Sequence, residues 1–337
     1  MILTSAIKKL QASKSLSIQE TEDVFSSIFH HDVSDDQIRE FLVLLYQKGE
    51  TYDEIMGAVR FLRKNGLSLD GGEDLLDCCG TGGDQKGTLN ISTAVAFVLA
   101  GGGVKVAKHG NRAVSSLSGS ADVLKELGVN INMSVETTLA CLKNTGITFL
   151  WAPQYYPILK KVGEVRKSIP HRTIFNLLGP LLNPMKATRQ LLGVFDKTFV
   201  PILARVLKDN GSQAAVVVSS EDGLDEFSLT AKAYTARLQS GEVSEFLFDP
   251  WKESGYQRAT ILDLKGGTPV ENALRLRRSL KGHSEPVDHV IHINAAWGFI
   301  IAGKAESFMD GLILAQDSVS SGKAYRKLEE FVEASHA

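Results

Sequence analysis

The feature that most constrains the fold is a change in hydrophobic pattern at about Leu75. From there on, short apolar runs alternate with stretches whose apolar residues recur at helical spacing. The runs expected to form strands are Leu75–Cys79, Val104–Lys108, Ile147–Trp151, Leu191–Phe195 and Ala214–Ser219. Helices are expected between them, among others at Thr93–Ala100, Ala121–Leu127 and Phe199–Lys208. This alternation predicts an α/β fold with a mostly parallel central sheet covered by helices.

The residues before this change, to about Gly66, are predicted to form helices only. Three helix starts carry the Ser/Thr-x-x-Glu/Gln pattern of a capping box: Ser17 with Glu20, Ser34 with Gln37, and Thr51 with Glu54. Gly49 and Gly66 stand where glycine commonly ends a helix. We therefore expect a small all-helical N-terminal domain ahead of a larger α/β domain.

The last third of the chain adds a hairpin and more helices. Ala233–Leu238 and Val243–Phe248 flank a short turn, which predicts an antiparallel hairpin at the margin of the sheet. From Pro269 onward the pattern is helical. The α/β domain should therefore have a helical C-terminal part.

Composition argues against several classes of function. The formal net charge is -2 and the isoelectric point about 6.5, so we expect no nucleic-acid partner. The longest apolar run, Ala295–Ala302, is too short to span a membrane, and the N-terminal sequence lacks a signal-peptide pattern. The cysteines Cys78, Cys79 and Cys141 show no zinc-site spacing. Buried reduced thiols in a cytoplasmic protein are the expected interpretation.

A glycine-rich segment, Gly80-Thr81-Gly82-Gly83-Asp84, follows the first expected strand. Glycines allow tight turns, and successive backbone N–H groups in such a loop can hold an anion. Asn90-Ile91-Ser92-Thr93 then begins an apolar helix, whose free N–H groups also favour phosphate. The spacing is neither that of a Walker loop nor that of a dinucleotide fingerprint. By itself the segment is weak evidence for a ligand site, and a plain tight turn is the favoured alternative.

A second polar segment follows the second expected strand. It runs from Lys108-His109-Gly110-Asn111-Arg112 to Ser118-Gly119-Ser120 and combines cations, an amide, hydroxyls and glycines. This combination suits several phosphate oxygens at once, although a solvated loop would have the same composition.

Two charged features complete the candidate site. Four carboxylates crowd the loop Glu221-Asp222-Gly223-Leu224-Asp225-Glu226 after the fifth expected strand. Hard oxygen ligands of this kind suit Mg²⁺, and a solvated acidic turn is the alternative. Arg166 could hold a carboxylate through two parallel hydrogen bonds, or it could be a surface arginine on a helix.

Taken in order, these segments resemble the anthranilate phosphoribosyltransferases. The resemblance rests on motifs spread over nearly the whole chain: GTGGD at 80–84, NIST at 90–93, KHGNR at 108–112, SGSAD at 118–122, RTIFNLLGPL at 172–181, Asp225-Glu226, Asn294-Ala295-Ala296 and Ala302–Ala305. It implies that a small helical domain comprises 1–70 and about 160–188, and that a large α/β domain comprises 71–159 and 189–337. It also implies a homodimer formed through the helical domains.

The same resemblance implies the ligands. The donor would be phosphoribosyl pyrophosphate, the acceptor anthranilate and the cofactor Mg²⁺, in tryptophan biosynthesis. Carried over motif by motif, the donor would meet Gly80, Gly83, Asp84, Thr88, Asn90, Ile91, Ser92, Thr93, Lys108, His109, Gly110, Asn111, Arg112, Ala113, Val114, Ser115, Ser116 and Ser120. The acceptor would meet Gly80, Asn111 and Arg166, with His109 and Pro180 close by, and the metal would involve Ser92, Asp225 and Glu226. His109 is the nearest candidate base.

The chain departs from these relatives at three places. Tyr156-Pro157-Ile158 stands where they tend to read His-Pro-Ala, Leu182 replaces the threonine of Leu-Thr-Asn-Pro, and Ile169-Pro170-His171 replaces a Leu-Gly-apolar turn. All three lie toward the acceptor or the hinge. Acceptor entry and affinity are therefore the properties most open to change.

Two other functions are alternatives to phosphoribosyl transfer. A pyrimidine nucleoside phosphorylase would share the architecture but would use free phosphate without a divalent cation, and the Asp225-Glu226 pair, Asn111 and Arg166 argue against it. A nucleic-acid-binding relative without transferase activity should carry a basic groove, which the charge does not support. Mg²⁺-dependent turnover of the pyrophosphate donor and a gel shift with DNA distinguish the three.

Overall fold

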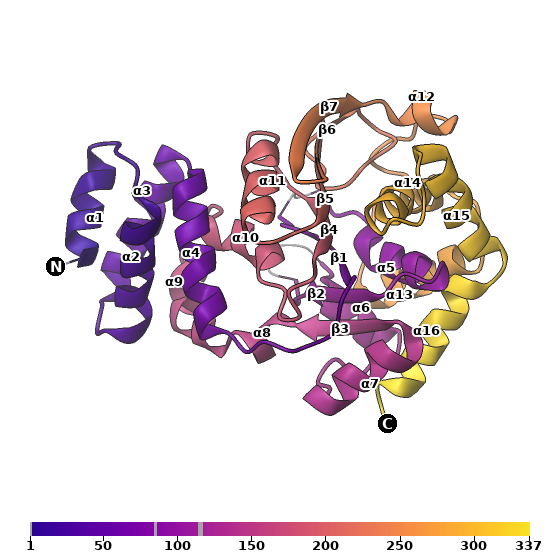
Figure 1. Ribbon diagram of the computed structural model, residues 1–337, viewed down its shortest axis with the longest axis horizontal. Coiled ribbons are helices and arrows are strands. Elements are labelled where there is room, and N and C mark those ends of the chain that lie inside the picture. The colour runs from indigo at the N-terminus through magenta and orange to yellow at the C-terminus, as the bar shows by residue number, and fades with distance from the viewer. Residues whose placement is uncertain (1, 84–85, 114–116) are drawn as a thin grey trace.

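The computed structural model describes residues 2–83, 86–113 and 117–337. In Figure 1, N-terminal helices lie at one end, the sheet lies in the middle, and the C-terminal helices lie at the other end. The N-terminal helices are α1 (Ile2–Gln11), α2 (Ile18–His30), α3 (Asp35–Lys48) and α4 (Tyr52–Asn65). They confirm the small helical N-terminal domain.

The helix starts expected from the sequence are present. Ser17 and Thr51 each form a complete capping box with the glutamate three residues on. At Ser34 the hydroxyl accepts a hydrogen bond from the Gln37 N–H (3.3 Å). There the Gln37 side chain contacts the Ser34 hydroxyl (3.4 Å) rather than completing the box on the backbone.

The sheet has seven strands within the described residues, in the order β3-β2-β1-β4-β5-β6-β7. They are β1 (Leu76–Gly80), β2 (Val106–Gly110), β3 (Ile147–Trp151), β4 (Arg189–Gly193), β5 (Ala214–Ser220), β6 (Ala233–Gln239) and β7 (Glu242–Phe248). Strands β1 to β5 run parallel, and β6 and β7 add the expected antiparallel hairpin. The prediction of a mostly parallel sheet is confirmed.

Strands β2 and β4 differ most from the sequence-based expectation, each by two residues. β4 lies two residues earlier than expected, and β2 runs from Val106 to Gly110, so that His109 and Gly110 belong to the strand and not to the loop after it. The expected strand ended at Lys108, but in the structure Lys108 and His109 are both buried and pair with Phe149 and Leu150 of β3. Tertiary pairing therefore extends the strand beyond its apolar run.

Helices connect and cover the strands. Between β1 and β4 lie α5 (Ile91–Gly101), α6 (Ser120–Glu126), α7 (Val135–Thr145), α8 (Ala152–Tyr155), α9 (Gly163–Lys167), α10 (Ile174–Leu178) and the 3-10 turns η1 (Pro157–Val162) and η2 (Gly179–Leu181). After β4 come α11 (Phe199–Asp209), α12 (Pro250–Ser254), α13 (Pro269–Leu280), α14 (Pro286–Ile301), α15 (Phe308–Ser320) and α16 (Lys323–Ala334). The C-terminal part is helical, as expected.

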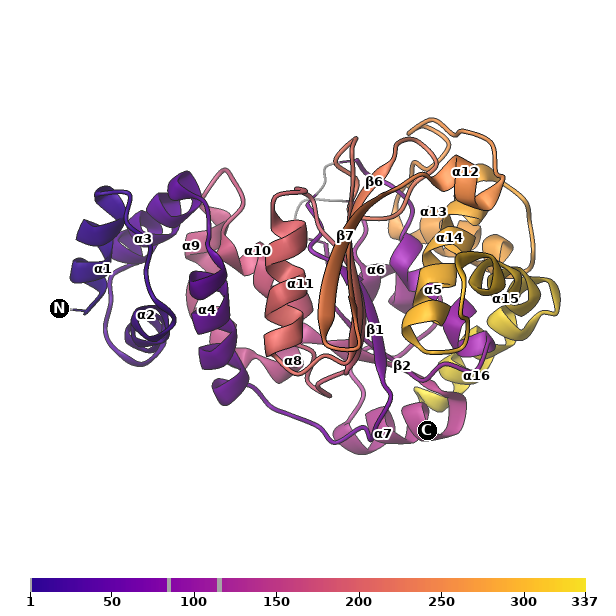
Figure 2. The same cartoon turned by 45° about the horizontal axis from the view of Figure 1, so that its top comes forward.

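The two faces of the sheet belong to two separate apolar cores. On β5, Val216 and Val218 pack toward α5 and α14, whereas Ala215 and Val217 pack toward α11 and the N-terminal helices. This alternation follows from the two-residue repeat of a strand. Figure 2 shows α11 and α5 on opposite sides of the sheet. Helices α9 and α10 contact α3 and α4, but the assignment of 160–188 to the small domain stays a prediction.

The connections create a crevice at one edge of the sheet. α5 follows β1 on one face and α11 follows β4 on the other, although β1 and β4 are neighbours. The chain therefore diverges at the carboxyl ends of β1 and β4, which is where open α/β sheets bind ligands. In the described part of the chain, no helix is long and apolar enough to cross a bilayer.

Candidate active site

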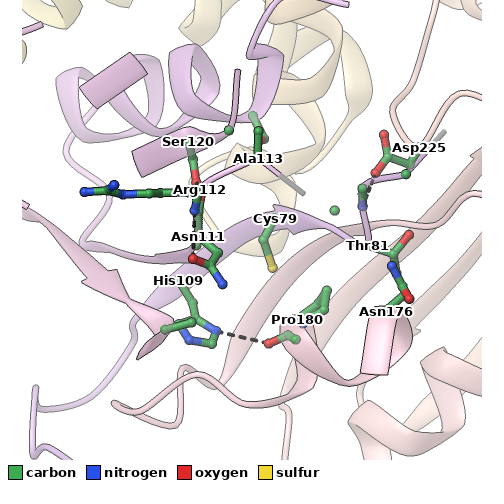
Figure 3. Close-up of a pocket in the computed structure, with 18 of the residues that line it drawn as sticks. Cys79, Thr81, His109, Asn111, Arg112, Ala113, Ser120, Asn176, Pro180 and Asp225 are labelled. Carbon is green, nitrogen blue, oxygen red and sulfur yellow. Dashed lines mark hydrogen bonds between the residues drawn. The ribbon is translucent and has the colours of Figure 1, made fainter. Parts of the chain in front are cut away.

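A cleft of about 320 Å³ lies at these strand ends. Every described residue to which the sequence assigned a ligand lines it: Gly80, Gly83, Thr88, Asn90, Ile91, Ser92, Thr93, Lys108, His109, Gly110, Asn111, Arg112, Ala113, Ser120, Arg166, Asp225 and Glu226. Asp84, Val114, Ser115 and Ser116 lie outside the described residues. In Figure 3, Asn111, Arg112 and Ser120 lie on one side of the pocket and Asp225 on the other.

The glycine-rich loop and the acidic loop are in direct contact. The Gly82 N–H donates a hydrogen bond to Asp225 Oδ2 (2.8 Å). A Cβ on Gly80 would meet the Asp225 carboxylate, and a Cβ on Gly193 would overlap the Asp225 backbone carbonyl. Gly82 and Gly83 have φ values of 63° and 72°, in the left-handed region that favours glycine. The glycines thus allow Asp225 to lie across the ends of β1 and β4.

Lys108 brings a buried positive charge to the floor of the cleft. Its side chain is 3% exposed, and Nζ donates to the Cys78 carbonyl (2.5 Å) and to Ser92 Oγ (3.2 Å). Burial raises the pKa of the Cys78 thiol to about 12 and that of Cys79 well above its ordinary value. Both cysteines are therefore protonated at neutral pH and cannot serve as nucleophiles.

The first turn of α5 faces the cleft. Asn90 precedes this helix, but its side chain does not cap the helix. Instead it donates to the Ser118 carbonyl (3.0 Å) and accepts from Asn272 Nδ2 (2.9 Å). Asn90 therefore joins the two polar loops, while residues 91–93 line the cleft.

His109 is buried as a neutral imidazole. Its Nδ1 lies 3.0 Å from the Gly179 carbonyl, which can only accept, so Nδ1 carries the proton and Nε2 a lone pair. Burial lowers the pKa of His109 to about 4. Within the described residues Nε2 has no hydrogen-bond partner. It can therefore accept a hydrogen bond or a proton from a ligand.

The segment that begins at Gly179 is fixed by buried polar side chains. Gln190 Nε2 donates to the Pro180 carbonyl (2.6 Å). Asn183 Nδ2 donates to Asp77 Oδ2 and to the Ala107 carbonyl, both at 2.8 Å. Asp77 also accepts from the His109 backbone N–H (3.1 Å), and burial raises its pKa to about 6. These bonds hold one wall of the cleft against β1 and β2.

Toward the N-terminal helices the lining of the cleft is largely apolar, and Arg166 adds a cation there. Its lining includes Leu62, Tyr156, Leu159, Phe175, Leu178 and Leu182. The Arg166 guanidinium lies 5.0 Å from the centre of the Phe175 ring. Burial lowers the pKa of Arg166, as expected for a guanidinium placed against an apolar surface. This end suits a flat aromatic ligand with a negative charge.

The departure at Tyr156 corrects the interpretation of Gly66. Gly66 follows α4 with φ -95° and ψ 161°, so it is extended and does not form a left-handed helix end. A Cβ there would collide with the Tyr156 ring, which is 4% exposed. The ring centre lies 6.2 Å from that of His109. The sequence could not show this contact because it joins residues far apart in the chain.

Comparison with known proteins identifies the family. The helical bundle domain and the a/b domain of the glycosyl transferase family match residues 4–66 and 72–325. The anthranilate phosphoribosyltransferase of Rhodopseudomonas palustris (strain TIE-1) is 43% identical over 99% of this chain and 98% of its own length. The chain belongs to the anthranilate phosphoribosyltransferase family. The Clostridium beijerinckii relative is 42% identical over 98% of both chains.

Solved structures of anthranilate phosphoribosyltransferases share the fold. The Thermus thermophilus enzyme superposes with a TM-score of 0.90 at 38% identity, covering 98% of this chain and 99% of its own. The Saccharomyces cerevisiae enzyme in complex with PRPP and Mg gives 0.90 at 28% identity, covering 99% and 98%. The family and fold expected from the motifs are confirmed, whereas the ligand contacts of individual residues stay predictions.

Mg²⁺ fits the oxygen donors of this cleft. Ser92, Asp225 and Glu226 all line it, and they offer the hard oxygen ligands that Mg²⁺ prefers. Within the described residues, no three or more His, Cys, Asp or Glu side chains gather into a metal site. Proteins often hold Mg²⁺ with one or two carboxylates, while substrate phosphates and water complete its coordination.

Some lining residues were not assigned from the sequence. Thr81, Phe175 and Asn176 were quoted only as parts of motifs, and Leu62 only belongs to an apolar stripe of α4. Asn176 Oδ1 accepts from the Thr173 N–H (3.0 Å). An amide inside an apolar run was a detectable signal, but Leu62 offered none.

Proposed function

We propose that this chain transfers the 5-phosphoribosyl group of phosphoribosyl pyrophosphate to the amine of anthranilate and releases pyrophosphate. The observation that carries the proposal is the division of one cleft into two chemically different ends. Buried Lys108, the glycine loop and the Asp225-Glu226 pair line one end, and an apolar surface with Arg166 lines the other. The first end suits a pyrophosphate and the second an aromatic carboxylate.

At the donor end, the chain stabilises the leaving group. The bond between C1 of ribose and pyrophosphate breaks as the bond to the acceptor nitrogen forms, so negative charge grows on pyrophosphate. Lys108 Nζ, the N–H groups of the glycine loop and the first turn of α5, which all line the cleft, would stabilise that charge. Asp225, Glu226 and Ser92 would hold Mg²⁺, which neutralises phosphate charge when bound.

At the acceptor end, the chain orients the nucleophile. Arg166 would hold the carboxylate of anthranilate, and the apolar residues would bury its ring. The acceptor amine is itself the nucleophile, so rate comes mainly from position and electrostatics. The amine must lose one proton after the bond forms, and His109 Nε2 is the nearest candidate to receive it. Tyr156 and Leu182 also line the cleft and would tune acceptor fit.

The proposal extends to assembly and location. We expect a homodimer formed through the helical domains, in the cytoplasm, with 160–188 as part of the small domain. Exposed apolar side chains on these helices, Ile2 at 50% and Tyr46 at 44%, are compatible with a contact there. Light scattering of the full chain should give twice the chain mass, and a monomer would overturn this part.

A substrate comparison tests the function. Anthranilate fluorescence should fall only when phosphoribosyl pyrophosphate and Mg²⁺ are both present. Cleavage of a pyrimidine nucleoside by inorganic phosphate without a divalent cation would instead support the phosphorylase alternative. Retardation of DNA at moderate salt, without turnover, would support the nucleic-acid-binding alternative.

A further inference from the structure

Asn294 is a fully buried amide in the middle of the apolar helix α14 (0% exposed). Its Oδ1 accepts from the Phe227 N–H (3.1 Å), and its Nδ2 donates to the Phe227 carbonyl (2.8 Å) and to the Val290 carbonyl (2.8 Å). One side chain thus pairs with both backbone groups of a single residue. Because the two groups belong to consecutive peptide units, this pair of bonds fixes the position and the orientation of the backbone at that residue.

Phe227 directly follows the Asp225-Glu226 pair. These residues lie between β5 and β6, outside any helix or strand. Without a ladder of regular backbone hydrogen bonds, their position depends on individual contacts. The backbone contact at Phe227 is made by the Asn294 amide, which does not itself line the cleft.

Further contacts hold the same tripeptide. The Gly82 N–H donates to Asp225 Oδ2 (2.8 Å), and Ser220 Oγ donates to the Glu226 carbonyl (2.8 Å). The Phe227 ring stacks on Trp297 of α14, with ring centres 5.4 Å apart and planes 14° apart. Helix α14 therefore holds Phe227 by its backbone through Asn294 and by its ring through Trp297.

The chemistry of the position favours a role in the loop over a role in the helix core. A polar amide inside an apolar helix costs stability unless its hydrogen bonds are satisfied. Here they are satisfied mainly by Phe227, on a loop that packs against the helix. An aliphatic side chain would fill the same space but would leave the Phe227 N–H and carbonyl without these partners.

We propose that Asn294 is a positioning residue for the metal-binding carboxylates. By fixing the Phe227 peptide, it sets the direction in which Asp225 and Glu226 enter the cleft. This inference rests on the proposed function, because it assumes that these carboxylates hold Mg²⁺ against pyrophosphate.

The test uses two substitutions and a matched control in the full chain. Asn294→Ser cannot reach Phe227, but its hydroxyl can bond to the Val290 carbonyl one turn back, so the helix keeps a satisfied polar group. Asn294→Asp keeps the shape and the acceptor for the Phe227 N–H, but its carboxyl donates no bond when ionised and only one when protonated, so at least one donated bond is lost. Ser318→Ala is the control, since Ser318 is also buried and donates to a backbone carbonyl, that of Val98 (2.7 Å), on another helix.

The measurements separate positioning from general damage. We expect both Asn294 variants to need at least about 10-fold more Mg²⁺ for half-maximal activity, since residues that orient metal ligands typically affect affinity to this extent. Calorimetric titration with pyrophosphate and Mg²⁺, which needs no turnover, should show a similar loss of affinity. The anthranilate KM should match that of Ser318→Ala.

Each outcome is decisive. If a folded Asn294 variant matches Ser318→Ala in Mg²⁺ requirement and in pyrophosphate affinity, the positioning role is wrong while the proposed function stands. If neither variant folds, the amide serves the fold and the inference is equally overturned. If the unaltered chain shows neither Mg²⁺-dependent transfer nor Mg²⁺-dependent pyrophosphate binding, the proposed function fails as well.

Discussion

The buried carboxylate of Asp77 makes a specific prediction about pH and stability. Asp77 is 0% exposed and lies on β1 beneath the wall of the cleft. Burial raises its pKa from 3.8 to about 6, and the hydrogen bond from Asn183 opposes that rise. The substitution Asp77→Asn removes the titrating group and keeps its shape.

The sign of the effect follows from where the proton is held. Between the unfolded pKa and the raised folded pKa, the folded chain binds a proton that the unfolded chain does not. Asp77 therefore favours folding at low pH, and that contribution is lost as the pH rises through about 6. The shift corresponds to about 3 kcal/mol in total, of which about 2 kcal/mol falls between about pH 4.5 and pH 7.

Urea unfolding followed by circular dichroism at a series of pH values measures this effect. Other groups titrate in the same range, so the informative quantity is the difference in unfolding free energy between the unaltered chain and Asp77→Asn. The unaltered chain should lose about 2 kcal/mol relative to the variant as the pH rises over that range. Asn183→Ala removes the bond that opposes the pKa rise, so its pH dependence should extend to higher pH.

Two results would refute this reasoning. Parallel stability curves for the unaltered chain and Asp77→Asn would show that the folded and unfolded pKa values of Asp77 are equal. A difference that grows in favour of the unaltered chain as the pH rises would show that its hydrogen bonds outweigh its burial.

Further predictions concern the cleft. Arg166→Ala should raise the anthranilate KM about 10- to 100-fold, because a charge-assisted hydrogen-bond pair is lost, and should leave the donor KM unchanged. The control variant Lys167→Ala should leave both KM values unchanged. An equal rise of both KM values in Arg166→Ala would refute the assigned role. Asp225→Ala with Glu226→Ala should abolish the Mg²⁺ response and most activity, whereas Glu221→Ala, exposed on the same loop, should not; an unaltered Mg²⁺ response in the double variant would disprove the metal assignment. Gly193→Ala should cost about 1–3 kcal/mol of stability by overpacking against the Asp225 backbone, and thermal unfolding identical to that of the unaltered chain would contradict this.

Much of the fold was predictable because its signals are local. The capping residues Ser17 and Thr51 and the alternation of apolar runs are properties of short segments, and they appear as expected. The candidate site was predictable for a related reason. Its loops follow parallel strands, whose carboxyl ends meet at one edge of the sheet.

The features that escaped prediction depend on contacts between distant segments. His109 extends β2 beyond the expected end at Lys108 because its backbone N–H donates to Asp77 and its Nδ1 to the Gly179 carbonyl. Gly66 has a role that only the position of Tyr156 explains. The link from Asn294 to Phe227 joins residues 67 positions apart. No periodicity or spacing rule encodes such pairs.

The central claim is that one cleft couples loss of pyrophosphate from the donor to its transfer onto anthranilate. The most direct measurement follows anthranilate fluorescence and pyrophosphate release together, in one sample of the unaltered chain. We predict that one pyrophosphate appears for each anthranilate consumed, and that neither signal changes without Mg²⁺ or without the donor. Pyrophosphate release without loss of anthranilate, or no release at all under these conditions, would contradict the account.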